Sequence, residues 1–246
     1  MSQSASPEDA VEASAPGLQK VRRWQVMRRI LKLYAEPRYL EVGVCQGKTF
    51  DKVPAARKVA VDPAFRFDHV AMQAAHPEST YHPVPSDDYF ARHAAPDDEL
   101  DLIYLDGLHV YDQTLRDLLN GLEHLQPRGV IVIDDTVPPT SLAAIRERRD
   151  FDAERRRTGS DRKEWMGDVY KVVHFIQAFC PYLRYATIEN NHGQTVVWRG
   201  QRDEPPLRTL GEIHDMTFDD FTETLSVMRI RPFQEIRREL RRDLGL

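Results

Sequence analysis

The sequence predicts an α/β protein with a mainly parallel sheet, and three observations support this prediction. Short β-type segments occur at 38–44, 58–62, 100–106 and 129–135. Helical patterns separate several of these segments, as the βαβ units of a parallel sheet require. The run 102–105 is apolar, which is typical of a central strand that is covered on both faces. We therefore expect one large α/β domain.

Helices are predicted on either side of these strands. Within 18–34, apolar residues recur every three or four positions, and Pro37 closes the segment, so we expect an amphipathic helix before the first strand. Over 110–126, leucines repeat at helical spacing until Pro127 and Gly129 break the pattern. This arrangement predicts a βαβ crossover between the last two strands.

The chain after the last parallel strand has three parts. The charged stretch 145–163 predicts a solvated helix followed by a mobile loop, and another helix is expected at about 164–180. Two β-rich runs within 182–199 predict a closing antiparallel hairpin. The tail 201–246 predicts a helical extension that packs or dimerises, although its arginines also fit an anionic ligand. One face of its last helix carries Phe233, Ile236, Leu240 and Leu244.

Composition restricts the classes of partner. The chain has 246 residues, with 34 Lys+Arg against 39 Asp+Glu, so it lacks the basic excess of most nucleic-acid-binding proteins. Two cysteines are too few for a disulfide framework and favour a cytoplasmic location. No apolar stretch approaches the roughly 20 residues of a membrane span. Residues 1–17 predict a disordered leader, which leaves 18–200 as the main domain.

Polar residues follow the predicted strands where a parallel sheet binds its ligands, beyond the carboxyl ends. The first strand ends in Glu41, Gly43 and Gly47, and the glycines allow either a close approach to a ligand or a tight strand-to-helix turn. The second strand ends in Asp62, 19 residues after Gly43. An acidic residue at this spacing commonly accepts hydrogen bonds from ribose hydroxyls. Ser86 and Asp87 follow a third stretch.

Carboxylates also follow the next two strands, as Asp106 and the pair Asp134 and Asp135. Asp106 and Gly107 fit a turn, but three carboxylates in one cleft repel each other unless a divalent cation neutralises them. Since no cysteine or histidine stands at zinc spacing, the oxygen-rich set favours Mg²⁺.

Four motifs, "YLEVGVCQG", "VAVDP", "DLIYLDGLHVY" and "GVIVIDD", resemble the class I S-adenosylmethionine-dependent methyltransferases. The resemblance is to the metal-dependent O-methyltransferases that act on sugars of macrolide and aminocoumarin antibiotics, and it spans roughly residues 38–200. It implies a Rossmann-like sheet of seven strands, with helices on both faces and an antiparallel last strand.

The resemblance also implies roles for individual residues. Asp106, Asp134 and Asp135 would hold the metal. The cofactor pocket would be formed by Glu41, Gly43, Gly47, Asp62, Ser86 and Asp87. His109 stands where catechol O-methyltransferase has its catalytic lysine, three residues after the first metal aspartate. The segment 164–171 is similar to one that borders the substrate cleft, which would give Trp165 and Asp168 a substrate role.

Two of these residues have structural alternatives. An imidazole with a pKa near 6.5 suits a general base at neutral pH, but His109 could instead cap the next helix or bond an aspartate. Trp165 could belong to a core stripe with Val169, Val172 and Ile176.

Three functions remain open at this point. The first is transfer of a methyl group from S-adenosylmethionine to a hydroxyl of a small acceptor, most simply a saccharide, with Mg²⁺ as a Lewis acid and a possible homodimer as the assembly. The second is an NAD-dependent oxidoreductase, although Cys45 stands where the middle glycine of the dinucleotide motif would be. The third is a cofactor-binding protein without catalysis. Acceptor specificity would lie in lid segments at 18–35 and 140–168.

Overall fold

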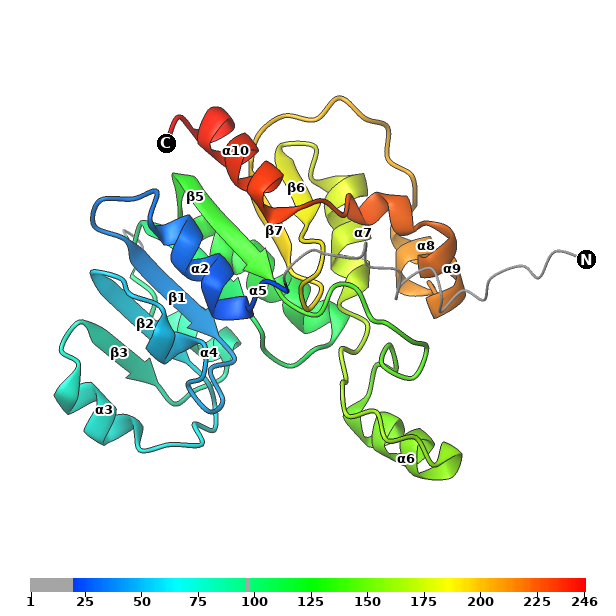
Figure 1. Ribbon diagram of the computed structural model, residues 1–246, viewed down its shortest axis with the longest axis horizontal. Helices are drawn as coiled ribbons and strands as arrows, with labels where there is room; N and C mark the ends of the chain where they lie inside the picture. Colours follow the sequence, from blue (N-terminus) through cyan, green and yellow to red (C-terminus); the bar gives the residue numbers. More distant parts are fainter. Residues whose placement is uncertain (1–19, 96–97) are drawn as a thin grey trace, which may run out of the picture.

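The computed structural model describes residues 20–95 and 98–246, so the leader expected at 1–17 lies outside the described residues. These residues form a seven-stranded sheet in the order β3-β2-β1-β4-β5-β7-β6 (Figure 1). The strands are β1 (Arg38–Val42), β2 (Arg57–Val61), β3 (Ser79–His82), β4 (Leu100–Leu105), β5 (Leu125–Ile133), β6 (Leu183–Thr187) and β7 (Thr195–Arg199).

Helices connect and cover the strands. They are α2 (Arg23–Leu31), α3 (His69–Ala75), α4 (Ser86–Arg92), α5 (Tyr111–His124), α6 (Arg148–Thr158), α7 (Tyr170–Phe179), α8 (Leu210–His214), α9 (Phe218–Glu223) and α10 (Phe233–Leu244), with short 3₁₀ turns η1 (Phe50–Lys52) and η2 (Leu225–Met228). Among the described residues, no helix has both the length and the apolar character that a membrane span needs.

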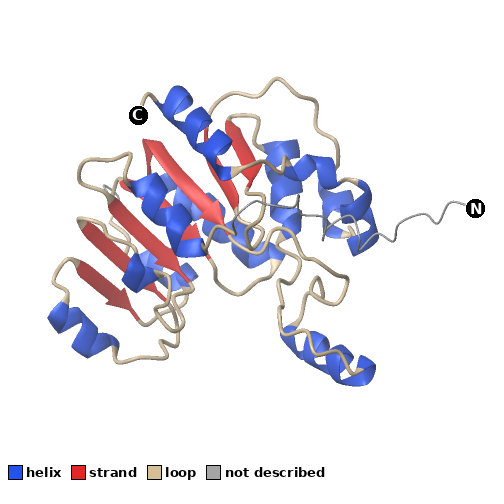
Figure 2. Cartoon of the chain, in the orientation of Figure 1, coloured by secondary structure: helices blue, strands red, loops and turns tan. Residues whose placement is uncertain are grey.

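Strand pairing confirms the predicted fold class. Strands β1 to β5 pair in parallel, whereas β7 runs antiparallel to both β5 and β6. Helices lie on both faces of this sheet (Figure 2). The carboxyl ends of β1, β2, β3, β4 and β5 therefore meet at one edge, where the sequence placed its polar residues.

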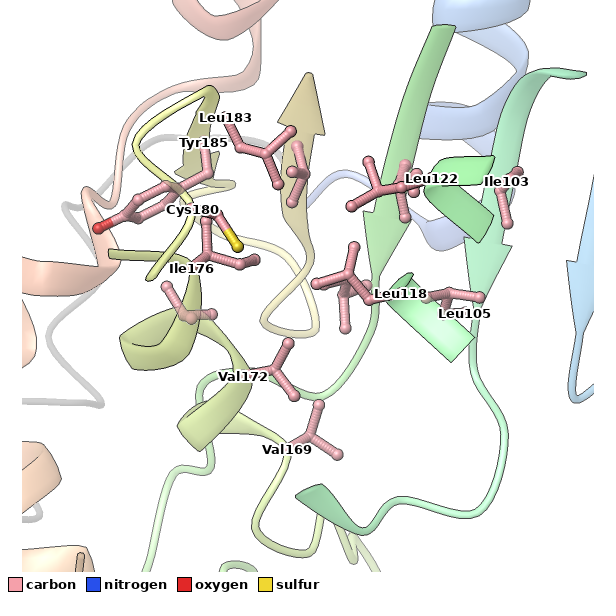
Figure 3. Close-up of a cluster of buried hydrophobic side chains, with 14 of the residues drawn as sticks. Ile103, Leu105, Leu118, Leu122, Val169, Val172, Ile176, Cys180, Leu183 and Tyr185 are labelled. Carbon is pink, nitrogen blue, oxygen red and sulfur yellow. The ribbon is translucent and has the colours of Figure 1, made fainter. Parts of the chain in front are cut away.

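Two apolar cores follow from the alternation of side chains along each strand. Ile103 and Leu105 of β4 point to the face covered by α4, α5 and α7, where Leu118 and Ile176 pack against them (Figure 3). The alternate residue Tyr104 points to the opposite face, in the core that includes α2 and α10. Both faces of β4 are thus buried, as its apolar run 102–105 predicts.

The sequence left one strand without bounds, and one helix begins later than expected. The chain stretch before Ser86 is the short edge strand β3, whose alternating burial and polar composition give a weak pattern. The helix expected from residue 164 begins only at Tyr170. Gly167 explains the late start, because it has a φ of +61° and a Cβ there would lie 1.8 Å from the carbonyl oxygen of His109. The chain at 164–169 is thus shaped by contact with the candidate site.

The C-terminal tail is part of both cores. Its last helix, α10, buries the apolar face that the sequence predicted, with Phe233 and Ile236 packed against the sheet. Ile213 of α8 and Phe221 of α9 join the opposite core. Because the apolar face of α10 is buried within the chain, the predicted homodimer would need another surface.

Helix α6 confirms the helix expected within the charged stretch 145–163. It projects away from the sheet, and among its residues only Phe151 is buried (Figure 1). Its first residue, Arg148, lies at the wall of the cavity described below.

Candidate active site

A cavity of about 640 Å³ opens at the carboxyl edge of the sheet. Gly43 after β1, Asp62 after β2, Ser86 after β3, and Asp106 and His109 after β4 all line it. This volume lies within the range of small-molecule sites. The structure therefore brings five of the predicted site residues, from four strand ends, to one cavity.

Gly43 allows β1 and β4 to come close together at the cavity wall. It has a φ of +88°, and a Cβ at this position would lie 1.9 Å from the carbonyl oxygen of Asp106. The amide of Asp106 donates to the carbonyl of Val42 at 2.9 Å, which continues the β1–β4 pairing by one residue. The glycine thus sets the position of Asp106 as well as the width of the cavity.

Asp62 organises the loop that follows β1. Its carboxylate accepts hydrogen bonds from the backbone amides of Cys45 and Ala64, each at 2.7 Å. One oxygen serves each amide, so each retains a lone pair for a ligand in the cavity. Asp62 therefore holds the loop after β1 in place and lines the cavity.

The remaining residues predicted for the cofactor support the cavity without lining it. Gly47, with a φ of +74°, turns the loop after β1. Asp87 is exposed and accepts a hydrogen bond at 3.1 Å from Gln113, which also donates to Ser86 at 3.1 Å. Glu41 is buried and accepts a 2.6 Å hydrogen bond from the Tyr39 hydroxyl. Burial raises the pKa of Glu41 to about 8.

The three aspartates predicted as metal ligands lie together beside this cavity. Asp134 and Asp135 are buried, and the hydroxyl of Tyr104 donates to Asp134 at 2.7 Å and to Asp106 at 3.2 Å. Arg23 of α2 inserts its guanidinium among the three carboxylates. It contacts Asp134 through Nε, Asp135 Oδ1 through Nη2 at 3.2 Å and Asp106 Oδ2 through Nη1 at 3.7 Å.

Two imidazoles also reach the aspartates. His109 Nδ1 lies 2.6 Å from Asp135 Oδ2, and His192 Nδ1 lies 3.2 Å from Asp135 Oδ1. His109 and Asp135 both have left-handed backbone, with φ values of 61° and 59°. Non-glycine residues rarely adopt this conformation, and those that do cluster at functional sites.

The charges in the cluster shift its protonation equilibria. Burial, together with the neighbouring Asp106 and Asp135, raises the pKa of Asp134 well above its usual range. Burial acts in the same direction on Asp135, but His109, His192 and Arg23 outweigh it and hold its pKa well below the usual range. Burial alone would lower the pKa of His109, yet Asp135 and Asp106 raise it above 6.5.

The donor groups fit a divalent cation. Asp106, His109 and Asp135 can each bring one ligand atom within 4.8 Å of the others, as can Asp134, Asp135 and His192. Asp134 Oδ1 is buried without a hydrogen-bond partner in the described part of the chain. Because buried carboxylates need compensating charge, this oxygen and the raised pKa of Asp134 indicate that Arg23 alone does not balance the cluster.

The sequence analysis placed His109 beside the carboxylates, and the structure adds His192 to them. Imidazole nitrogen suits zinc and other transition metals, whereas Mg²⁺ prefers oxygen. The three aspartates alone keep the oxygen set that Mg²⁺ would use.

Trp165 lines the cavity, as its predicted substrate role requires. Its indole stacks on the imidazole of His109, with ring centroids 5.1 Å apart and planes at 16°. The guanidinium carbon of Arg148 lies 5.5 Å from the centroid of the Trp165 ring, and the indole N–H donates to the carbonyl of Ile145 at 2.6 Å. These contacts hold Trp165 against His109 and define one wall of the cavity.

Asp168 lies away from the cavity wall. It is buried, accepts a hydrogen bond from the amide of Tyr111 at 2.7 Å, and pairs with Arg146 at 3.0 Å. These contacts join the start of α5 to the chain before α7. The structure thus gives Asp168 a structural position, and its predicted contact with substrate would require a rearrangement.

Two residues of the cluster, Arg23 and His192, were missed by the sequence analysis. Both lie outside the strand ends, on α2 and on the loop between β6 and β7. One signal for Arg23 was available: it starts a helix that has no acidic residue in its first turn. A cation at this end of a helix is unfavourable, so it needs carboxylates nearby.

Comparisons with known proteins agree with this architecture. The sequence profile of a family described as a methyltransferase domain matches residues 40–136. The matched segment carries all the predicted cofactor and metal residues. The match covers less than half of the chain and is a likeness over this segment. No curated protein matches the sequence significantly.

Several solved structures are similar to this chain. The O-methyltransferase TomG of Streptomyces achromogenes, in complex with S-adenosylmethionine, has 15% identity and a TM-score of 0.50, over 77% of this chain and 82% of that chain. The cofactor-bound protein Rv0187 from MTB has 16% identity and a TM-score of 0.48, over 80% and 87% of the two chains. The N-methyltransferase NodS of Bradyrhizobium japonicum has 17% identity and a TM-score of 0.44, over 72% and 93%. The likeness to TomG is one of fold: a Rossmann-like methyltransferase sheet.

Proposed function

We propose that this protein is an S-adenosylmethionine-dependent O-methyltransferase that acts on a hydroxyl of a small, hydroxyl-rich acceptor, most simply a saccharide, with Mg²⁺ at the three aspartates. The observation that carries the proposal is one cavity that joins a ribose-binding carboxylate, Asp62, to a carboxylate and an imidazole, Asp106 and His109. The methyltransferase-domain match over residues 40–136 supports the transferred group.

The cofactor would occupy the part of the cavity between Gly43, Asp62 and Ser86. Asp62 would accept hydrogen bonds from the two ribose hydroxyls, while the small Gly43 leaves room for the ligand beside the β1–β4 contact. S-adenosylmethionine would supply a methyl group bound to a positively charged sulfur. The acceptor oxygen would bond to the methyl carbon as the bond from carbon to sulfur breaks. The protein's task is to hold that oxygen in line with the methyl carbon.

The acceptor would bind at the other end of the cavity, near Asp106 and His109. A divalent cation held by Asp106, Asp134 and Asp135 would lower the pKa of an acceptor hydroxyl by Lewis-acid polarisation. His109 contacts Asp135 through Nδ1, so its Nε2 is the nitrogen that can take the proton from that hydroxyl. Asp135 orients the ring, and Trp165 packs on its face.

The side chains around His109 support a hydroxyl-rich acceptor. Arg23, Asp106 and His109 offer several hydrogen-bonding groups, which suits a molecule with more than one hydroxyl. One face of the Trp165 ring already packs on His109, so stacking of an aromatic acceptor on that face is excluded. This favours a saccharide over a catechol.

A methyl-transfer screen tests the proposed function. The full chain is incubated with S-adenosylmethionine carrying a labelled methyl group and with mono- and oligosaccharide acceptors, with Mg²⁺ or with EDTA. We expect label in an O-methyl ether of at least one saccharide, and loss of transfer with EDTA. Label on nitrogen, or full activity in EDTA, would contradict the O-specific or the cation-dependent part.

A further inference from the structure

Arg23 occupies the centre of the three-aspartate cluster, where a cation would bind. Its three guanidinium nitrogens each contact a different carboxylate: Nε contacts Asp134, Nη2 contacts Asp135 and Nη1 contacts Asp106. One side chain thus uses the same three residues that the proposed function assigns to Mg²⁺. A guanidinium and a divalent cation in this space would repel each other strongly, because both carry positive charge.

Helix α2 offers the Arg23 side chain no favourable charge interaction of its own. It is the first residue of α2, whose first turn contains no acidic side chain. The partial positive charge at a helix N-terminus disfavours an arginine at this position. The contacts with the aspartates are therefore what stabilises the side chain in its observed place.

The start of α2 is held in position independently of the guanidinium. The amide of Val21 donates to the carbonyl of Asn190 at 3.1 Å, and the side chain of Asn191 donates to the carbonyl of Val21 at 2.9 Å. The loop that supplies these bonds also carries His192, which contacts Asp135. The backbone before Arg23 therefore stays near the cluster whichever way the side chain points.

The Arg23 side chain can also leave the cluster for the cavity. Arg23 lines the cavity, and 31% of its side chain is exposed, whereas Asp134 and Asp135 are nearly fully buried. A rotation about the flexible arginine stem would move the guanidinium from the aspartates into the cavity without moving the anchored backbone.

We propose that Arg23 and a divalent cation are alternative occupants of the Asp106–Asp134–Asp135 cluster: the guanidinium pairs with the carboxylates in the cation-free protein and moves into the cavity when the cation binds. The inference rests on the cation-dependent part of the proposed function. It goes beyond that function because it makes Arg23 a determinant of cation affinity. Arg23 lies outside the matched segment 40–136.

Cation titration tests the competition. Binding of Mn²⁺ and of Mg²⁺ is measured by calorimetry on the full chain and on Arg23→Gln, with Arg28→Gln as the matched control. Arg28 is an exposed arginine of the same helix, so its replacement makes the same charge change. We expect Arg23→Gln to bind either cation at least tenfold more tightly than the unaltered chain, and Arg28→Gln to match the unaltered chain within about twofold. Circular dichroism checks that both variants fold.

A second measurement works on the unaltered chain and so does not depend on a folded variant. The side-chain Nε–H signal of Arg23 is followed by ¹⁵N NMR while Mg²⁺ is added. We expect this signal to move to the position of solvent-exposed arginines and to exchange faster with water. A signal that stays unchanged at saturating Mg²⁺ would overturn the inference.

The outcomes separate the inference from the function beneath it. If Arg23→Gln and the unaltered chain bind the cation with equal affinity, or the variant binds it more weakly, Arg23 does not compete and the inference fails while the cation site stands. If neither protein binds Mn²⁺ or Mg²⁺, the cation part of the proposed function fails and the inference fails with it.

Discussion

His109 and Asp135 contact each other through their side chains, with 2.6 Å between Nδ1 and Oδ2, and both hold left-handed backbone. The two residues follow different strands, β4 and β5. Such a pair fixes the orientation of the imidazole, as in other carboxylate–imidazole arrangements, and places Nε2 3.8 Å from Asp106 Oδ1. The account of catalysis depends on this relationship.

Replacement of His109 by alanine tests the proposed base. We expect methyl transfer to fall by about 10²–10⁴-fold, the usual effect of losing a general base. A general base must be deprotonated to accept a proton, so the rate of the Mg²⁺-loaded enzyme should fall as the pH is lowered, and His109 should be the source of this acid limb of the pH–rate profile. The limb should disappear in His109→Ala.

The control for this variant is His76→Ala, which removes an imidazole that ends α3 far along the chain from the cluster. It should leave the rate and the profile unchanged. Normal turnover of His109→Ala at neutral pH would return His109 to the structural role of bonding Asp135.

Replacement of Asp62 tests the cofactor end of the cavity. Asp62→Ala removes the proposed acceptor of two ribose hydroxyls, so the affinity for S-adenosylmethionine should fall tenfold or more, since charge-assisted hydrogen bonds contribute about 1.5–3 kcal/mol each. The variant also loses the bonds to the amides of Cys45 and Ala64. Asp68→Ala, which removes an exposed carboxylate from the start of α3, is the control. Unchanged calorimetric affinity in Asp62→Ala would remove Asp62 from the site.

Trp165 is expected to position His109 through stacking. Aromatic pairs contribute about 0.5–1.5 kcal/mol, so Trp165→Ala should lower kcat by about 2–10-fold. Trp165→Phe keeps a ring against the imidazole and should retain most of kcat, although it loses the hydrogen bond to Ile145. Steady-state kinetics measure kcat of the two variants. Equal kcat values would show that stacking on His109 does not contribute to the rate.

Glu41 should make stability depend on pH. Its pKa is about 8 in the folded protein, against 4.5 in the reference state. Between these values the folded state keeps a proton that the unfolded chain loses, so the contribution of Glu41 to stability falls as pH rises, by at most about 1.4 kcal/mol per pH unit.

Urea unfolding at pH 5 and pH 8 measures this contribution. Glu41→Gln mimics the protonated side chain and should lose less stability than the unaltered chain as pH rises. Glu36→Gln, at an exposed position, should behave like the unaltered chain. The same pH dependence in Glu41→Gln and in the unaltered chain would contradict the raised pKa.

Much of the fold and part of the site could be predicted from the sequence, for one physical reason. Parallel strands bring their carboxyl ends to one edge, so Asp62, Asp106 and Asp134 had to lie along the same edge of the sheet once the strands were recognised. The uncharged run in β4 and the leucine spacing of α5 made those elements clear. The polar strand β3 gave no such pattern, which is why its bounds could not be set.

Residues that reach the site from other layers could not be predicted in this way. Arg23 depends on how α2 packs across the sheet, and His192 depends on the loop between β6 and β7, so neither position follows from strand order. Asp168 was predicted to contact substrate, but its side chain contacts Tyr111 and Arg146 and does not line the cavity. Local sequence does not fix these orientations.

The central claim is that the cavity binds S-adenosylmethionine, and calorimetric titration of the full chain tests it most directly. S-adenosylmethionine and NAD⁺ are each titrated with and without Mg²⁺. The account predicts saturable, one-to-one binding of S-adenosylmethionine and no binding of NAD⁺ under either condition. Saturable binding of NAD⁺ together with none of S-adenosylmethionine would contradict the account and favour an oxidoreductase.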